Sequence, residues 1–171
     1  MSTEYHTSEG VVLKKMPAGE ADFLIRVLSQ DFGKIDLLAK GARKSTAKLN
    51  SHLDMFNFVR LSWVKNGERL PTLIDAEIIE RFDYWFLDAE HIASIGRIGK
   101  CLDALLPAGA EDSEALALLI SFLRTQLSAQ ALGEYEHTFL NKFLEHEGYA
   151  TAFLPPEVSD VIMRLWPNWK S

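Results

Sequence analysis

The chain has few of the residues from which disulfide-stabilised or metal-dependent proteins are built. It contains one cysteine, Cys101, which excludes an intramolecular disulfide framework and any zinc site made of several thiolates. Apolar stretches are short, and none approaches the roughly 18 uninterrupted residues of a membrane-spanning helix. The N-terminus also lacks the basic and apolar regions of a secretory signal peptide. We therefore expect a soluble, cytoplasmic protein without a membrane partner.

Catalytic and cofactor-binding spacings are missing as well. The five histidines never show the helical spacing of a zinc metalloprotease, and Cys101 has no neighbouring histidine in sequence. Neither Gly33 nor Gly41 belongs to a GxxxxGK[ST] or GxGxxG motif. A metal at His146 and its flanking glutamates is disfavoured, because successive helical residues point in different directions. We predict a protein that is not an enzyme and that uses no metal, small-molecule substrate or cofactor.

Charge is divided unevenly along the 171 residues, whose net charge is -6. Residues 1–81 carry twelve Lys and Arg against eleven Asp and Glu, a net charge of +1, whereas residues 82–171 carry six against thirteen, a net charge of -7. Such asymmetry suggests that one half of a chain meets an anion while the other half does something else.

The most basic stretch is residues 34–48, KIDLLAKGARKSTAK. Four cations follow Asp36 there without an intervening carboxylate: Lys40, Arg43, Lys44 and Lys48. Cations along a loop with Gly and Ser suit a phosphate backbone, because each neutralised phosphate releases condensed counterions. Charge alone would favour the alternative, a solvated surface without a ligand.

Alternating apolar and polar residues predict short strands in the first half. They lie at residues 10–15, 23–28, 35–39, 55–65 and 72–79, and Asn66-Gly67 is a strong hairpin signal between the last two. The connections are too short for crossover helices, which favours a small antiparallel barrel that closes to remove its edges. An OB-fold is the leading candidate, and an SH3-like barrel has a similar strand count.

The second half changes to a helical period. Apolar residues recur every three or four positions over residues 92–105, 116–127, 134–147 and 157–166. Asp112 or Ser113 can cap the second helix, and Gly148 can end the third. The expected fold class is therefore α+β and multidomain: an N-terminal OB-fold antiparallel β-barrel at residues 1–81, and an all-α helical domain at residues 82–171.

Aromatic residues near the fourth strand allow two interpretations. Phe56 and Phe58 lie on the opposite face from Val59, Leu61 and Trp63 only if no bulge intervenes. One set could then be displayed for stacking on bases, but packing in the core is favoured because aromatic rings carry large apolar area.

Several short motifs together resemble the N-terminal signature of the RecO family, bacterial DNA repair and recombination mediator proteins. They occur in the family's order and approximate spacing: Glu9-Gly10, Gly19-Glu20-Ala21-Asp22, Gly33-Lys34, Ala39-Lys40-Gly41-Ala42-Arg43, Leu70-Pro71-Thr72 and Ala76-Glu77. A weaker resemblance continues in the helical half, where Phe139 to Tyr149 is similar to the family's helix ending in Gly-Tyr.

The resemblance implies binding of single-stranded and double-stranded DNA, strand annealing, and recombinase loading together with RecR and single-stranded DNA-binding protein. No cofactor is implied, and the protein would be nucleoid-associated. The DNA-binding residues would be Lys40, Arg43, Lys44 and Lys48, with Lys34, Lys14 and Lys15 as weaker candidates.

For the helical domain, the resemblance implies a site for the acidic, hydrophobic-ended tail of single-stranded DNA-binding protein. The candidate residues are the internal cations Arg97, Lys100, Arg124 and Lys142. An alternative function is a protein–protein adaptor whose helical domain binds repair partners while the barrel is a scaffold. Many family members carry a four-cysteine zinc module after the Gly-Tyr helix. Only 22 residues without cysteine follow Tyr149 here, so we expect a short form that lacks this module.

Overall fold

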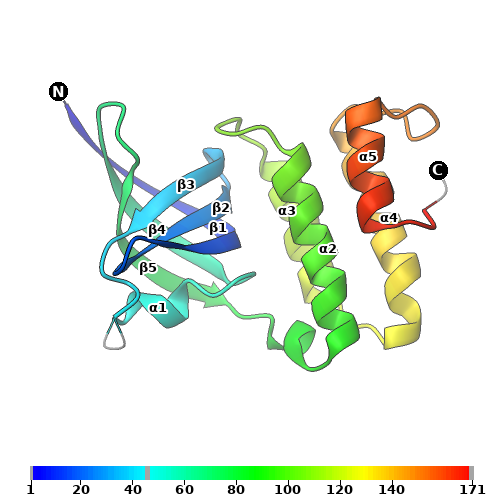
Figure 1. Ribbon diagram of the computed structural model, residues 1–171, viewed down its shortest axis with the longest axis horizontal. Coiled ribbons are helices and arrows are strands. Elements are labelled where there is room, and N and C mark those ends of the chain that lie inside the picture. Colours follow the sequence, from blue (N-terminus) through cyan, green and yellow to red (C-terminus); the bar gives the residue numbers. More distant parts are fainter. Residues whose placement is uncertain (1, 45–46, 170–171) are drawn as a thin grey trace. The chain divides into compact units, whose positions relative to one another are not determined.

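The fold is α+β, with five strands followed by several helices (Figure 1). The computed structural model describes residues 2–44 and 47–169. Two compact units can be separated by their internal contacts. The barrel unit comprises the described residues up to Arg81 together with Pro107–Leu116, and the helical unit comprises Phe82–Leu106 and the described residues from Ala117 onward. A domain boundary after residue 81 stays a prediction.

The strands of the barrel unit form one closed sheet. They are β1 (Thr3–Ala18), β2 (Asp22–Ser29), β3 (Gly33–Ala39), β4 (Phe58–Asn66) and β5 (Thr72–Glu80). Their order around the barrel is β1-β2-β3-β5-β4, and β1 closes the sheet by pairing with β4. All pairs are antiparallel except β3 and β5, which meet at a single parallel position, Leu38 with Thr72. The wall between β3 and β5 is therefore the least paired part of the barrel.

Strand β1 is longer than the sequence predicts, because it serves two neighbours in turn. Residues 3–11 pair with β4, and residues 10–18 pair with β2. Gly10 lies where the two pairings overlap, and a Cβ there would stand 2.5 Å from the Leu28 carbonyl oxygen. The absence of a side chain at residue 10 thus lets β1 pass close to β2 while it changes partner.

The barrel core is apolar and includes the residues of β4 that alternate along the strand. Val59, Leu61 and Trp63 are all buried in it. Phe58 is buried too, because the register of β4 against β5 shifts between Phe58 and Val59. Phe56, whose φ is +65°, is 3% exposed. The interpretation of these aromatics as packing residues agrees with their burial.

The helical unit is built from helices that agree with the predicted periodic stretches to within a few residues. The elements from residue 83 onward are η1 (Asp83–Phe86), α2 (Ala89–Leu105), α3 (Ser113–Arg124), η2 (Ala129–Ala131), α4 (Leu132–His146) and α5 (Pro156–Leu165). Asp112 caps α3 by accepting a hydrogen bond from the Ala115 amide. Gly148, with φ at +81°, follows α4 as a helix-ending residue.

Aromatic rings fill much of the core of the helical unit. Trp85 of η1 stacks on Phe122 with ring centroids 4.9 Å apart, and its indole N–H donates to the Leu123 carbonyl at 2.8 Å. Phe122 in turn contacts Tyr135 and Phe139 of α4. This cluster fixes η1 against α3 and α4, because packed aromatic rings bury large apolar areas. The polar atoms of Trp85 and Tyr135 are both hydrogen-bonded. Within the described part of the chain, no helix combines the length and apolar character needed to cross a lipid bilayer.

A short segment between α2 and α3 packs with the barrel strands. The Gly109 amide donates to the Lys34 carbonyl at 2.9 Å, and Lys34 and Ala108 form an isolated parallel bridge. Gly33 adopts φ of +64°, and a Cβ at this position would collide with the carbonyl of Ala110. Residues 107–116 therefore belong to the barrel unit although they are remote from its strands in sequence.

Candidate nucleic-acid interface

The basic segment, residues 40–48, begins directly after β3 and is hydrogen-bonded to the turn between β1 and β2. The Gly41 amide donates to the Asp22 carboxylate at 2.7 Å, and the Arg43 amide donates to the Ala21 carbonyl at 2.9 Å. The Arg43 guanidinium also donates to the Gly19 carbonyl. Gly41 makes this path possible, because its φ of +68° is unfavourable for residues with a side chain. The start of the segment is thus held by backbone contacts to a neighbouring turn.

All four principal cations of the segment are exposed: Lys40, Arg43, Lys44 and Lys48. In the described chain, the ammonium groups of Lys40, Lys44 and Lys48 form no hydrogen bond or ion pair. Ser45 and Thr46, which lie between them, fall outside the described residues. The structure therefore brings four cations to one connection between β3 and α1 (Leu49–His52), the short helix that precedes β4, and leaves three of them available to a ligand.

The weaker DNA-binding candidates, Lys14, Lys15 and Lys34, have different surroundings from the four principal cations. The Lys15 ammonium donates to the carbonyl and the side chain of Asn50 at 2.8 and 2.7 Å and lies 3.2 Å from the Asp54 carboxylate. It also lies 4.8 Å from the centre of the Phe23 ring. These contacts tie α1 to β1 and compensate the charge of Lys15 within the barrel unit. Lys14 and Lys34 are half-buried, and their part in DNA binding stays a prediction, as does that of Lys15.

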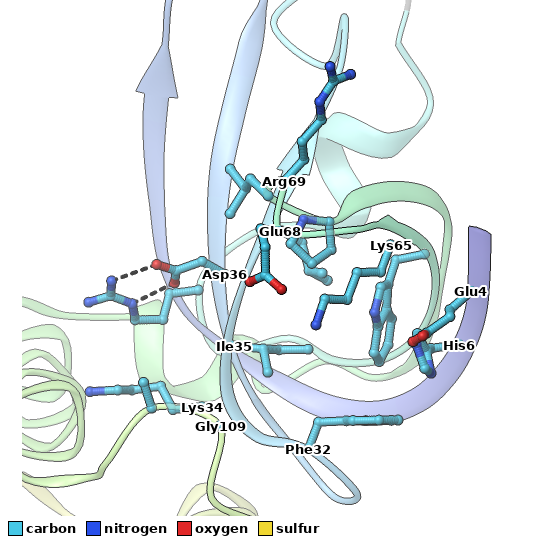
Figure 2. A pocket seen from close by; sticks show the side chains of 16 residues that line it. Glu4, His6, Phe32, Lys34, Ile35, Asp36, Lys65, Glu68, Arg69 and Gly109 are labelled. Atoms are coloured by element: carbon cyan, nitrogen blue, oxygen red, sulfur yellow. Dashed lines mark hydrogen bonds and ion pairs between the residues drawn. The ribbon is translucent and has the colours of Figure 1, made fainter. Parts of the chain in front are cut away.

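A pocket of about 850 Å³ opens in the barrel unit at the weakly paired wall between β3 and β5. Its apolar side contains Phe32, Ile35 and Trp63, and His6 stacks on Trp63 with ring centroids 5.7 Å apart. Phe32 meets Trp63 edge-on at 5.1 Å. Figure 2 shows His6, Phe32 and Ile35 around the cavity. Lys34, one of the predicted DNA-binding residues, lines this pocket, but the sequence did not predict the cavity itself. His6 lies opposite Trp63 in the β1–β4 register. This pairing would have indicated the pocket from the sequence only if β1 had been predicted to start before residue 10.

Charged groups of both signs rim the same pocket. Arg26 and Asp36, on paired positions of β2 and β3, form a two-pronged ion pair with distances of 2.7 and 2.8 Å. Lys65 and Glu68, from the β4–β5 hairpin, are exposed and point toward the cavity in Figure 2. Neither side chain has a hydrogen bond or ion pair with the described residues. Lys65 and Glu68 thus offer an unengaged donor and an unengaged acceptor beside the apolar wall of the pocket.

The cations predicted to bind partners lie on three different helices of the helical unit. Arg97 and Lys100 lie on α2, Arg124 ends α3, and Lys142 lies on α4. Lys100, Arg124 and Lys142 are exposed. Arg97 instead makes a two-pronged ion pair with Glu136, which is 1% exposed, and the Nε–Oε2 distance is 2.9 Å. Because Glu136 already compensates its charge, the main role of Arg97 is to stabilise the helical unit.

Two buried titratable groups of the helical unit have shifted pKa values with clear causes. Burial raises the pKa of the Cys101 thiol to about 12, so the thiol stays protonated at neutral pH and is unsuited to nucleophilic chemistry. Burial would also raise the pKa of Glu136, but hydrogen bonds from Arg97 and the Trp166 indole outweigh it and hold the pKa below its usual range. Glu136 is therefore a buried carboxylate anion.

These observations define the class as a two-unit α+β protein, in which a closed five-stranded barrel carries an exposed basic segment and is followed by a helical unit. Residues 1–82 match the family model described as "Recombination protein O N terminal". Residues 1–82 therefore match the RecO family, which confirms the resemblance noted in the sequence.

Curated relatives support the same assignment. The chain is 28% identical over 119 residues to the DNA repair protein RecO of Thermodesulfovibrio yellowstonii, an alignment that covers 70% of this chain and 48% of the relative. It is 28% identical over 151 residues to that of Nocardioides sp., with 86% of this chain and 62% of the relative covered. It is 39% identical over 82 residues to that of Gloeothece citriformis, with 48% of this chain and 28% of the relative covered. The chain therefore spans about half the length of most of these relatives.

Proposed function

We propose that this protein binds DNA through the basic segment of its barrel unit and acts in recombinational DNA repair. The observation that carries the proposal is the set of exposed cations Lys40, Arg43, Lys44 and Lys48 on one anchored connection. Contacts of this kind are electrostatic and tolerant of sequence, because they are made to phosphates rather than to base edges. Lys34, Lys14 and Lys15 would contribute less.

The strand order supports assigning the barrel unit as an OB-fold rather than an SH3-like barrel. An OB-fold closes by pairing its first strand with its fourth, and places the fifth strand between the third and fourth. The order β1-β2-β3-β5-β4 has both features. OB-folds commonly bind oligonucleotides across their second and third strands and the loops that join strands 1 and 2 and strands 4 and 5. The basic segment follows the third strand and is hydrogen-bonded to Ala21 and Asp22 beside the first of these loops.

The relatives are named DNA repair protein RecO, and their family role suggests how the DNA site would be used. In this proposal the protein is a mediator and catalyses no reaction. It holds single-stranded DNA for annealing, and it assists recombinase loading with RecR and single-stranded DNA-binding protein. Lys100, Arg124 and Lys142 of the helical unit would attract the acidic tail of the latter.

The salt dependence of binding to a single-stranded oligonucleotide tests the DNA site. Four phosphate contacts predict a slope of log affinity against log salt of about -3, from about -0.7 per neutralised phosphate. Replacing Arg43 and Lys44 by Ala should weaken binding and flatten the slope by about one or more. Fluorescence anisotropy over a range of salt concentrations measures both quantities.

A matched control removes the same charge from the helical unit. The double variant Lys100→Ala and Lys142→Ala changes two exposed cations there and should leave the slope as it is. If the slope of the Arg43 and Lys44 variant equals that of the wild type, the basic segment is not the DNA site.

A protein–protein adaptor is a second candidate function, and the helical unit supplies its observation. A smaller pocket of about 310 Å³ there is lined by Leu165, Trp166 and Trp169 with Arg97 at its margin. The acidity of residues 82–171, with thirteen Asp and Glu against six Lys and Arg, would repel DNA from this half. Absence of oligonucleotide binding at low salt below micromolar concentrations would favour the adaptor over the DNA-binding mediator.

A further inference from the structure

The pocket between β3 and the β4–β5 hairpin differs in chemistry from the basic segment. The segment presents cations alone, which suits phosphate. The pocket presents Lys65 and Arg69 together with Glu68, and the carboxylates of Glu4 and Asp36 also line it. A ligand that offered only phosphate oxygens would leave Glu68 without a hydrogen-bond donor. The occupant must therefore present donors as well as acceptors.

The shape of the pocket adds a second constraint. Its volume of about 850 Å³ lies in the range of about 300–1,000 Å³ that is usual for small-ligand sites. Ile35 and Phe32 are half-buried and form its apolar wall, while Trp63 is 3% exposed and serves as its packed base. Little of the Trp63 ring is available for stacking. A flat, partly apolar group would therefore lie against Ile35 and Phe32 instead.

The sparse pairing between β3 and β5 leaves this pocket open. Strands β3 and β5 pair only at Leu38 and Thr72, where the Leu38 amide donates to the Pro71 carbonyl at 2.8 Å. At the other end, the Lys34 carbonyl accepts from Gly109 at 2.9 Å. The stretch of β3 between these two contacts faces the pocket through Ile35 and Asp36. The opening is thus bounded by hydrogen bonds at both ends.

We infer that this pocket receives one unstacked base of a single DNA strand, an inference that rests on the proposed DNA-binding function. The base lies against Ile35 and Phe32, Lys65 donates to a base carbonyl or ring nitrogen, and Glu68 accepts from base N–H groups. A base removed from its stack is commonly read on its Watson–Crick edge by such hydrogen bonds. The site would hold the strand at one nucleotide while the basic segment holds its phosphates.

Lys65 and Glu68 together favour guanine among the four bases. Guanine alone offers two adjacent N–H donors to one carboxylate, with a carbonyl oxygen beside them for an ammonium group. The other bases can satisfy Glu68 through only one position at a time. Two-point hydrogen bonding to a base discriminates by about fivefold or more in affinity.

A comparison of two oligonucleotides tests the inference on the full chain. One is a 15-nucleotide thymidine strand, and the other carries a single guanine at its centre. The wild type should bind the guanine strand about fivefold more tightly or better. Glu68→Gln should reduce that ratio to near one, while its affinity for the thymidine strand stays the same or rises slightly. The control Glu20→Gln removes the same charge from an exposed turn outside the pocket lining and should keep the ratio.

The outcomes separate this inference from the function on which it rests. Arg43→Ala with Lys44→Ala should weaken both strands equally and leave the ratio unchanged. Binding of both strands with a ratio of one in the wild type, or an unchanged ratio in Glu68→Gln, would overturn the base pocket alone. If neither strand binds at low salt, the DNA-binding function and the base pocket both fail.

Discussion

The two units differ in where they keep their polar groups. Among the described residues, the buried polar side chains of the barrel unit are the neutral Ser8, Ser29 and Asn57, whereas those of the helical unit include Glu136 and His91. The barrel keeps its charges on the surface, where the cations of its basic segment remain open to a ligand. The helical unit uses charge to hold its own core, so its stability depends on pairing and on pH, and that of the barrel depends on close packing.

The largest expected effect on stability comes from breaking the charge pairing of the helical unit. Arg97→Ala leaves the buried Glu136 carboxylate with the Trp166 indole as its main partner. Removing one partner of a buried ion pair costs about 3 kcal/mol or more in the free energy of unfolding. Urea denaturation followed by circular dichroism measures the loss.

Two further variants sharpen this result. Lys100→Ala changes an exposed cation on the same helix and should alter the free energy of unfolding by no more than about 0.5 kcal/mol. Adding Glu136→Gln to Arg97→Ala removes the unpaired charge and should recover part of the loss. Equal effects of Arg97→Ala and Lys100→Ala would show that the pair is not needed.

The second effect breaks close packing in the barrel unit. Gly33→Ala places a methyl group against the Ala110 carbonyl at a residue with φ of +64°, and we expect a loss of about 2 kcal/mol or more. Gly19→Ala is the matched control, because its φ is +65° and nothing lies within 4 Å of the added Cβ. It should lose only about 1 kcal/mol, from backbone conformation alone. Thermal and urea denaturation of both variants measure the difference, and equal losses would contradict the close approach of residue 110.

The smallest effect is a pH dependence confined to the helical unit. Hydrogen bonds from His91 to the Asp88 carboxylate at 2.7 Å and to the Leu127 carbonyl at 2.9 Å raise the pKa of His91. Tyr84 and Glu90 are the other titratable groups beside it. The protonated ring can donate through both nitrogens, whereas the neutral ring can donate through only one.

The sign of the effect follows from that shift. A histidine with a raised folded pKa contributes stability that is fully present below its ordinary pKa of about 6.5 and is lost as the pH rises through the folded value. The melting temperature of the wild type should therefore fall relative to that of His91→Gln as the pH rises above about 6.5. The other four histidines are common to both proteins. Parallel curves would exclude His91 as the source.

Local patterns predicted most of the strands and helices, and non-local contacts account for what they missed. Residues 3–9 of β1 alternate weakly and are mostly exposed, so only pairing with β4 defines them as strand. The four cations of the basic segment are visible in sequence because they lie within nine consecutive residues, 40–48. Lys15 looks equivalent there, but its partners Asn50 and Asp54 are about 35 residues away. The pocket is assembled from five separate stretches of chain, so no single motif contains it.

The short segment at residues 107–116 has a consequence for how such a protein can be divided. Because it belongs to the barrel unit while the residues on either side of it belong to the helical unit, the chain passes from one unit to the other three times. Recombination between genes, or cloning, that transfers residues 1–81 as one contiguous cassette would leave the Lys34 carbonyl without its Gly109 partner. A barrel moved intact into another protein must therefore bring a second piece of sequence with it.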